Sequence, residues 1–168
     1  MPAQMSDAER KEYWDHIYNT KAADQVSWFQ AHPATAIGFV ESFNLALSAH
    51  IIDIGGGDSR FVDALLDRGY HNVWVLDISK KAIENARQRL GARSSQVHWI
   101  VCDATRFHPE IQFDYWHDRA AFHFLTNKEQ INEYVNVASR AVKYPGYLTI
   151  GTFSESGPKK CSGLDIRQ

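Results

Sequence analysis

Residues 51–60 limit what this chain can fold into more than any other stretch does. Their sequence is IIDIGGGDSR: an apolar run that contains Asp53, then three consecutive glycines, then Asp58 and Ser59 at the start of a segment with helical periodicity. This order predicts a strand, a tight turn and a helix, which is the first half of a βαβ unit. Glycine is required where the backbone adopts conformations that a Cβ atom forbids, or where a ligand lies against the main chain. The stretch therefore predicts a turn that approaches a ligand closely.

A second acidic residue supports a nucleoside site at this turn. Asp77 ends the next apolar run, VWVLD, about twenty residues after Gly57, the usual spacing of an acid that binds a ribose hydroxyl. Arg60 stands where a dinucleotide fold has its third glycine, and Asp58, a good candidate for the helix cap, would place a carboxylate where a pyrophosphate binds. S-adenosylmethionine has no phosphate and carries positive sulfonium and ammonium groups, so these residues favour it over NAD.

The chain from residue 50 onward alternates between strand-like and helix-like segments. This alternation predicts an α/β fold with a doubly wound, mostly parallel sheet of strand order 3-2-1-4-5. Ligands in such sheets lie beyond the carboxyl ends of the strands. We expect strands at 50–54, 73–77, 97–102, 113–117 and 147–153, and helices at 59–68 (closed by Gly69), 79–90 (closed by Gly91) and 127–142.

The N-terminal third of the chain predicts a helical flap. Residues 6–20 have the pattern of an amphipathic helix with Ser6 or Asp7 as its cap, and a second helix is expected near 34–43. Two roles are possible for Trp14 and Trp28. They fix the flap to the core, or they cover the cofactor, whose sulfonium an aromatic face would attract. We expect a single domain over 1–168, with the flap at 1–44 and a cofactor-binding core at 45–168.

Acidic residues follow three of the predicted strands, at Asp77, Asp103 and Asp118. Three carboxylates at one edge exceed what helix capping requires. Asp118 and His123 are the candidates for a catalytic base, which methyl transfer needs only if the acceptor arrives protonated. Two alternatives stay open: Asp118 pairs with Arg119 or caps the next helix, and His123 is a partly buried histidine among aromatic residues.

Longer strings carry a resemblance to a known family. The segments YWDHIY (13–18), VSWFQ (26–30), DIGGGDS (53–59), HDRAAFHFL (117–125) and GTFSESGPKKCSGLDI (151–166) resemble class I S-adenosylmethionine-dependent methyltransferases, over residues 12–168. They are most similar to an uncharacterised bacterial subgroup with an aromatic N-terminal helix. That subgroup is distantly similar to thiopurine methyltransferases and to some protein-lysine methyltransferases.

The resemblance implies a Rossmann-like fold, S-adenosyl-L-methionine as cofactor and a set of cofactor contacts. Asp77 would bind the ribose hydroxyls, Asp103 and Ala104 the adenine, and Gly55 and Gly57 the amino-acid part. The full set of expected cofactor contacts is Trp14, Trp28, Asp53, Gly55, Gly57, Asp77, Ile78, Asp103, Ala104 and His117.

The end of the chain departs from the family pattern. The family sheet has seven strands, the last two forming an antiparallel hairpin, but only fifteen residues follow residue 153 here. We expect this hairpin to be missing, because the chain is trimmed or the fold is completed differently. Strand five would then be an exposed edge that pairs with a second copy. Alternatively, the tail folds back and pairs once with that edge.

The composition argues against nucleic acid, membranes and metal ions as partners. Lys and Arg total 18 against 20 Asp and Glu, so no basic field recruits nucleic acid. No stretch approaches the ~20 apolar residues of a membrane span, and the eight histidines show no metal-ligand spacing. We expect a cytoplasmic enzyme that transfers a methyl group to a small molecule. The alternatives are a protein-lysine methyltransferase and a binding module without catalysis.

Overall fold

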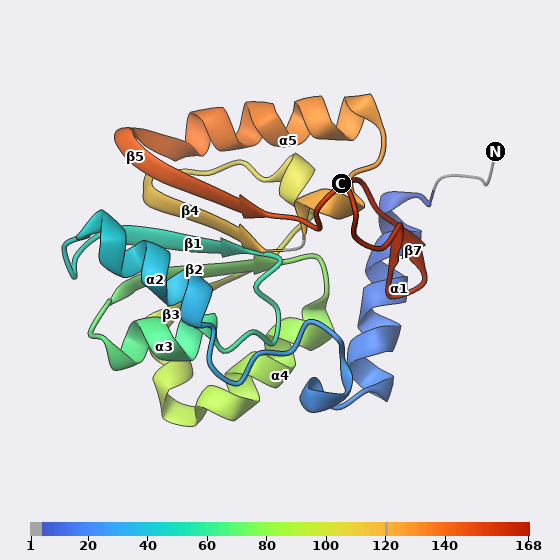
Figure 1. Ribbon diagram of the computed structural model, residues 1–168. Helices are drawn as coiled ribbons and strands as arrows, with labels where there is room; N and C mark the ends of the chain where they lie inside the picture. Colours follow the sequence, from blue (N-terminus) through green and yellow to red (C-terminus); the bar gives the residue numbers. More distant parts are fainter. Residues whose placement is uncertain (1–4, 120) are drawn as a thin grey trace.

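The computed structural model describes residues 5–119 and 121–168. Its centre is a five-stranded sheet of order β3-β2-β1-β4-β5, which confirms the predicted order (Figure 1). All neighbouring strands of this sheet are parallel. The strands are β1 (His50–Ile54), β2 (Asn72–Asp77), β3 (Val97–Val101), β4 (Phe113–Arg119) and β5 (Val142–Gly151).

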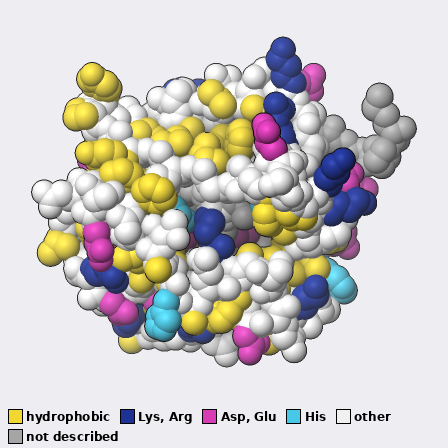
Figure 2. Space-filling view, viewed as in Figure 1, with side chains coloured by type: hydrophobic (Ala, Val, Ile, Leu, Met, Phe, Trp, Pro, Cys, Tyr) yellow, Lys and Arg dark blue, Asp and Glu magenta, His cyan; other side chains and the backbone are white. Residues whose placement is uncertain are grey.

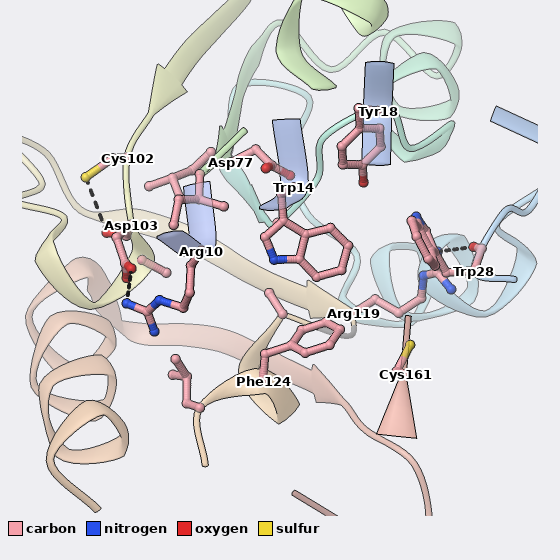
Figure 3. A pocket seen from close by; sticks show the side chains of 16 residues that line it. Arg10, Trp14, Tyr18, Trp28, Asp77, Cys102, Asp103, Arg119, Phe124 and Cys161 are labelled. Atoms are coloured by element: carbon pink, nitrogen blue, oxygen red, sulfur yellow. Dashed lines mark hydrogen bonds and ion pairs between the residues drawn. The ribbon is translucent and has the colours of Figure 1, made fainter. Parts of the chain in front are cut away.

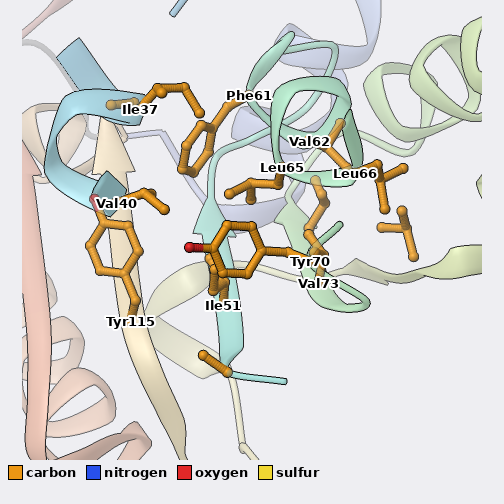
Figure 4. Packing of buried hydrophobic residues seen from close by; sticks show 14 of the residues in the cluster. Ile37, Val40, Ile51, Phe61, Val62, Leu65, Leu66, Tyr70, Val73 and Tyr115 are labelled. Carbon is orange, nitrogen blue, oxygen red and sulfur yellow. The ribbon is translucent and has the colours of Figure 1, made fainter. Parts of the chain in front are cut away.

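Helices cover both faces of the sheet, so it is doubly wound (Figure 1). Side chains along β1 alternate between the faces. Ile51 packs in a core beneath α2 (Ala34–Phe43), α3 (Phe61–Asp67) and α4 (Lys80–Leu90), part of which is shown in Figure 4. Ile52 packs in the opposite core, beneath α5 (Lys128–Ala141).

The helix after the glycine turn begins later than expected. α3 starts at Phe61, and the prediction that Asp58 caps it is wrong, because the Asp58 carboxylate pairs with Arg89 of α4. The Ser59 hydroxyl accepts from the Phe61 amide instead, at 3.1 Å. α4 ends at Leu90, and Gly91 follows as its C-cap with a φ of 56°, in the left-handed region expected for the closing glycine.

Helix α1 (Asp7–Thr20) lies across the carboxyl end of the sheet, alongside α4 (Figure 1). Ser6 caps it and forms a reciprocal capping box with Glu9. One oxygen of Asp15 accepts from the Ser79 hydroxyl at 2.7 Å and from the Lys81 amide at 3.0 Å. A carboxylate at a helix N-terminus is favourable, and here it ties α1 to the start of α4.

Strand β5 begins at Val142, earlier than the predicted 147, because Val142 already pairs with Phe113 of β4. The register then shifts, and the pairing resumes at Tyr147 opposite Tyr115. In the described part of the chain, β5 is an edge of the main sheet. A small antiparallel hairpin of β6 (Lys160–Cys161) and β7 (Leu164–Asp165) stands apart from that sheet.

The C-terminal tail (residues 152–168) does not return to the β5 edge, so the alternative in which it pairs there is not what the structure shows. The tail instead reaches α1, where the Tyr13 hydroxyl donates to the Ser162 carbonyl oxygen. Among the residues described, no helix is long and apolar enough to cross a membrane.

Candidate functional site

A cavity opens at the carboxyl ends of β1, β2 and β3, beneath α1 (Figure 3). This is where the predicted topology places a ligand. A second cavity adjoins it and shares Tyr18, Trp28, Gly55 and Arg119 with it. Figure 2 shows this face of the molecule hollowed, with Lys or Arg side chains inside the hollow. The first cavity is lined by seven of the expected cofactor contacts: Trp14, Trp28, Gly55, Asp77, Ile78, Asp103 and Ala104.

The glycine turn has no room for side chains. Gly55 and Gly57 have φ of 63° and 39°, in the region that favours glycine. A Cβ atom at Gly55 would lie 2.6 Å from the Ala121 Cβ, and one at Gly57 would lie 2.7 Å from Asp77 Oδ2. Gly55 lines both cavities. Gly57 lines neither, but it leaves the space that the Asp77 carboxylate occupies beside the first cavity.

Asp77 presents a buried carboxylate to the first cavity. Its Oδ1 accepts from the Ser79 amide at 2.8 Å. Burial raises the pKa of the Asp77 carboxyl to about 7. Near neutral pH, the Asp77 carboxyl at the end of β2 is therefore present in both its protonated and its ionised form.

Asp103, at the end of β3, is held from two sides. Its Oδ1 accepts from the amide and hydroxyl of Thr105, at 2.9 and 2.7 Å. Its Oδ2 accepts from Arg10 Nη2 at 2.6 Å. Arg10 lies on α1 and also lines the first cavity (Figure 3). The sequence prediction did not include Arg10, and no local pattern in the sequence indicates this contact.

Aromatic rings form one side of the first cavity. The ring centroids of Trp14 lie 5.0 Å from Phe124 and 5.8 Å from Trp28, and those of Tyr18 and Trp28 lie 6.3 Å apart. All four residues line the cavity, together with Cys161 of the tail. Tyr18 could have been found from the sequence, because it stands four residues after Trp14 and therefore shares its helix face.

Asp53 and His117 form a buried pair next to the second cavity. His117 Nδ1 and Asp53 Oδ1 lie 2.7 Å apart. The other oxygen of Asp53 is buried and has no hydrogen-bond partner in the described structure. Both residues line the second cavity. The Asp53 carboxylate thus keeps one unused acceptor at the turn.

Three cations also line the second cavity: Lys21, Arg60 and Arg119. Arg119 donates to the Trp28 carbonyl oxygen at 2.8 Å. Arg60 approaches a carboxylate only at 3.9 Å, that of Asp63. The cavity therefore carries positive charge that the described ion pairs leave largely unbalanced, which suits a bound carboxylate.

Asp118 lies outside both cavities. Its Oδ1 accepts from the amides of Ala121 and Phe122, at 2.9 and 3.2 Å, and its Oδ2 accepts from the Tyr134 hydroxyl at 2.6 Å. Burial raises the pKa of the Asp118 carboxyl to about 6. These contacts fix the turn after β4, and the catalytic role of Asp118 stays a prediction.

His123 also lies outside both cavities. Its side chain is fully buried, and neither ring nitrogen has a hydrogen-bond partner in the described structure. Burial lowers the pKa of the imidazole to about 4. The ring stacks on Phe153 with centroids 5.3 Å apart. Its catalytic role likewise stays a prediction.

Comparison with known proteins places this site in a family. A family model described as a methyltransferase domain matches residues 51–146, more than half of the chain. The chain belongs to this methyltransferase family. The matched residues contain the glycine turn, Asp77, Asp103 and the first half of β5, so they include the carboxyl ends of β1 to β4, where both cavities lie.

Two curated relatives show which methyltransferases this chain is similar to. It is 26% identical over 137 residues to malonyl-(acyl-carrier protein) O-methyltransferase 2 of Ilyobacter polytropus, covering 80% of this chain and 51% of that protein. It is 27% identical over 157 residues to EEF1A lysine methyltransferase 2 of Danio rerio, covering 83% of this chain and 66% of that protein. The chain thus spans about half to two thirds of these relatives.

The fold is also seen in solved structures. Phosphoethanolamine N-methyltransferase 1 of Haemonchus contortus, solved with phosphoethanolamine and S-adenosylhomocysteine, superposes with a TM-score of 0.69 at 18% identity, covering 95% of this chain and 36% of that one. At this identity the likeness concerns the fold. The predicted Rossmann-like methyltransferase fold is therefore confirmed.

Proposed function

We propose that this chain binds S-adenosyl-L-methionine and transfers its methyl group to a small-molecule acceptor. One observation carries the proposal: a bare glycine turn, a buried carboxylate at Asp77 and a wall of aromatic rings meet in one cavity at the carboxyl ends of the strands. Solved methyltransferases of similar fold that were crystallised with S-adenosylhomocysteine support the cofactor.

The adenosine part fits the first cavity. Asp77 would accept from the ribose hydroxyls, and Asp103 would accept from the adenine amino group. Ile78 and Ala104 line the same cavity and would lie against the base. The pair of acids at the ends of neighbouring strands β2 and β3 matches the order of sugar and base along a nucleoside.

The amino-acid part fits the second cavity. The unpartnered oxygen of Asp53 offers an acceptor to the ammonium group. Lys21, Arg60 and Arg119 offer positive charge to the carboxylate. The Asp58 carboxylate, which would repel an anion, is taken up by Arg89. Since Gly55 lines both cavities, the cofactor would pass over this bare residue.

The aromatic wall suits the charge of the cofactor. Trp14, Trp28 and Phe124 present rings to the cavity where the sulfonium would lie, and such faces attract cations. When bound, S-adenosylmethionine supplies a methyl group that an acceptor lone pair takes as the sulfur departs with its bonding electrons. The protein would contribute alignment of the reacting atoms, which displacement reactions depend on.

The elements that cover the cavity favour a small acceptor. Trp14 and Tyr18 of α1 and Cys161 of the tail line it, so α1 and the tail would limit the size of an acceptor that enters. A protein-lysine acceptor is the second candidate, because relatives include eEF1A lysine methyltransferases at 20–27% identity. A protein acceptor would have to bring a lysine side chain past α1 and the tail to reach this cavity.

One experiment separates the candidates. The protein is incubated with methyl-labelled S-adenosylmethionine and a cell extract, and the products are fractionated by size. We expect label in small metabolites. Label in a protein band would instead support a protein-lysine methyltransferase. A cofactor-binding module without catalysis would leave label in neither fraction while still binding S-adenosylhomocysteine. Asp77→Ala, which removes the ribose contact, is the control for background transfer.

We also propose that two copies pair through β5. Tyr147, Leu148 and Ile150 of this edge strand are 37–43% exposed, and an apolar edge is a template for strand pairing. Light scattering at increasing concentration should show self-association that Ile150→Lys weakens. Val135→Lys, at an exposed position on α5, is the matched control. A monomer at every concentration would contradict the pairing.

A further inference from the structure

Arg10 brings a cation into the first cavity with its hydrogen bonding incomplete. Its Nη2 donates to Asp7 at 2.7 Å and to Asp103 at 2.6 Å, and Figure 3 shows the contact with Asp103. Its Nε is buried and has no partner in the described structure. The side chain is 13% exposed, so little solvent reaches it. A buried N–H without an acceptor is unfavourable, so Nε is a donor that lacks a partner in a residue that lines the cavity.

The surroundings of Arg10 define the chemistry of that ligand. Asp103 supplies an acceptor beside the Arg10 guanidinium, and Ile78, Ala104 and Leu125 supply apolar surface in the same cavity. A matching ligand is flat and apolar on its faces, and it has a donor next to an acceptor on one edge. The edge of adenine has this pattern, since the ring nitrogens N1 and N7 flank its amino group.

We infer that Arg10 is a specificity-determining residue for the adenine ring, and that its Nε donates to N1 or N7 while Asp103 accepts from the amino group. This inference rests on the proposed function, because it assumes an adenosine cofactor in the first cavity. It assigns to α1 a direct contact with the base. The flap would then close on the cofactor through Arg10 as well as through its aromatic residues.

A neighbouring arginine provides a control for a purely structural role. Arg106 pairs with Asp7, as Arg10 does, but its side chain is 70% exposed and lines neither cavity. Loss of Arg106 therefore disturbs the same surface ion pairs without touching the base. Arg10→Lys is the informative variant, because lysine keeps the charge facing Asp103 but has no N–H at the position of Nε.

The test measures calorimetric affinity for S-adenosylhomocysteine and for its 1-deaza, 3-deaza and 7-deaza analogues. The wild-type protein should bind the 1-deaza or the 7-deaza analogue about tenfold more weakly than the parent, the factor for one lost hydrogen bond. Arg10→Lys should bind the parent about tenfold more weakly and should no longer discriminate against that analogue. Arg106→Gln should behave as the wild type does.

The outcomes separate this inference from the proposed function. A wild-type protein that does not bind S-adenosylhomocysteine contradicts the proposed function, and with it the inference. A wild-type protein that binds it but tolerates both the 1-deaza and the 7-deaza changes contradicts the inference alone, without any variant. Equal discrimination by wild type and a folded Arg10→Lys also overturns the inference, because the lost contact would then come from another donor.

Discussion

The carboxylate of Asp77 fills the space that a side chain at Gly57 would need. A Cβ atom at Gly57 would stand 2.7 Å from Asp77 Oδ2, a separation shorter than real Cβ contacts allow. The glycine turn after β1 and the acid at the end of β2 are therefore one unit. The spacing of about twenty residues between them has a direct meaning, since the turn makes room for the carboxylate that would hold a ribose.

Gly57→Ala should weaken S-adenosylhomocysteine binding by about tenfold or more, because the methyl group displaces the Asp77 carboxylate and strains a backbone φ of 39°. The matched control is Gly38→Ala on α2, where no atom lies within 4 Å of the added Cβ. That variant should bind normally and should be stabilised by about 0.5–1 kcal/mol through helix propensity. Equal affinities of the two variants in calorimetry would contradict the idea that Gly57 makes room for the Asp77 carboxylate.

Cofactor affinity should fall as the pH drops below 7. Burial raises the pKa of the Asp77 carboxyl to about 7 in the free protein. Accepting two ribose hydroxyls requires the ionised form, so binding below this pH must release a proton. The affinity should then decrease by up to about tenfold per pH unit. Titrations from pH 8 to 5.5 should show this slope in the wild type and little of it in Asp77→Asn. An affinity of the wild type that does not change with pH would show that Asp77 does not make the ribose contact.

Trp14 should favour the charged cofactor over its neutral product. A ring facing the sulfonium contributes about 0.5–2 kcal/mol to S-adenosylmethionine binding and nothing comparable to S-adenosylhomocysteine. Trp14→Leu should therefore lower the ratio of the two affinities by about threefold to thirtyfold. The ratio within one variant corrects for any general loss of fold. An unchanged ratio would mean that Trp14 only fixes α1 to the core.

Asp118→Asn tests whether this residue acts in chemistry or holds the turn after β4. Its oxygens accept from Tyr134 and from two backbone amides, so we expect the free energy of unfolding to fall by about 1–3 kcal/mol. Methyl transfer per folded molecule should stay within a few-fold of the wild type. A loss of turnover of about a hundredfold or more with unchanged stability would instead support a catalytic base.

Local patterns in the sequence predicted much of the fold, and seven of the ten residues expected to contact the cofactor line one cavity. The β1–glycine–α3 segment and Asp77 could be predicted because an apolar run, a glycine turn and an acid at the end of a strand are each recognisable within a few residues. The strand order followed from the alternation of elements, and the structure confirms it.

Contacts between distant residues could not be predicted in this way. The sequence around Asp58 predicts a helix cap, but in the structure its carboxylate forms an ion pair with Arg89, thirty-one residues later. Arg10 meets Asp103 across 93 residues, and Cys161 reaches the first cavity only because the tail crosses to α1. Each of these depends on how separate elements pack, which a single sequence does not display.

Calorimetric titration with S-adenosylmethionine, S-adenosylhomocysteine and NADH tests the central proposal most directly. We expect the wild-type protein to bind both S-adenosylmethionine and S-adenosylhomocysteine, and Asp77→Ala to bind both much more weakly. NADH should bind more weakly than either, because Arg60 stands where a dinucleotide fold has its third glycine. Tighter binding of NADH, or no binding of S-adenosylhomocysteine by the folded wild type, would contradict the account.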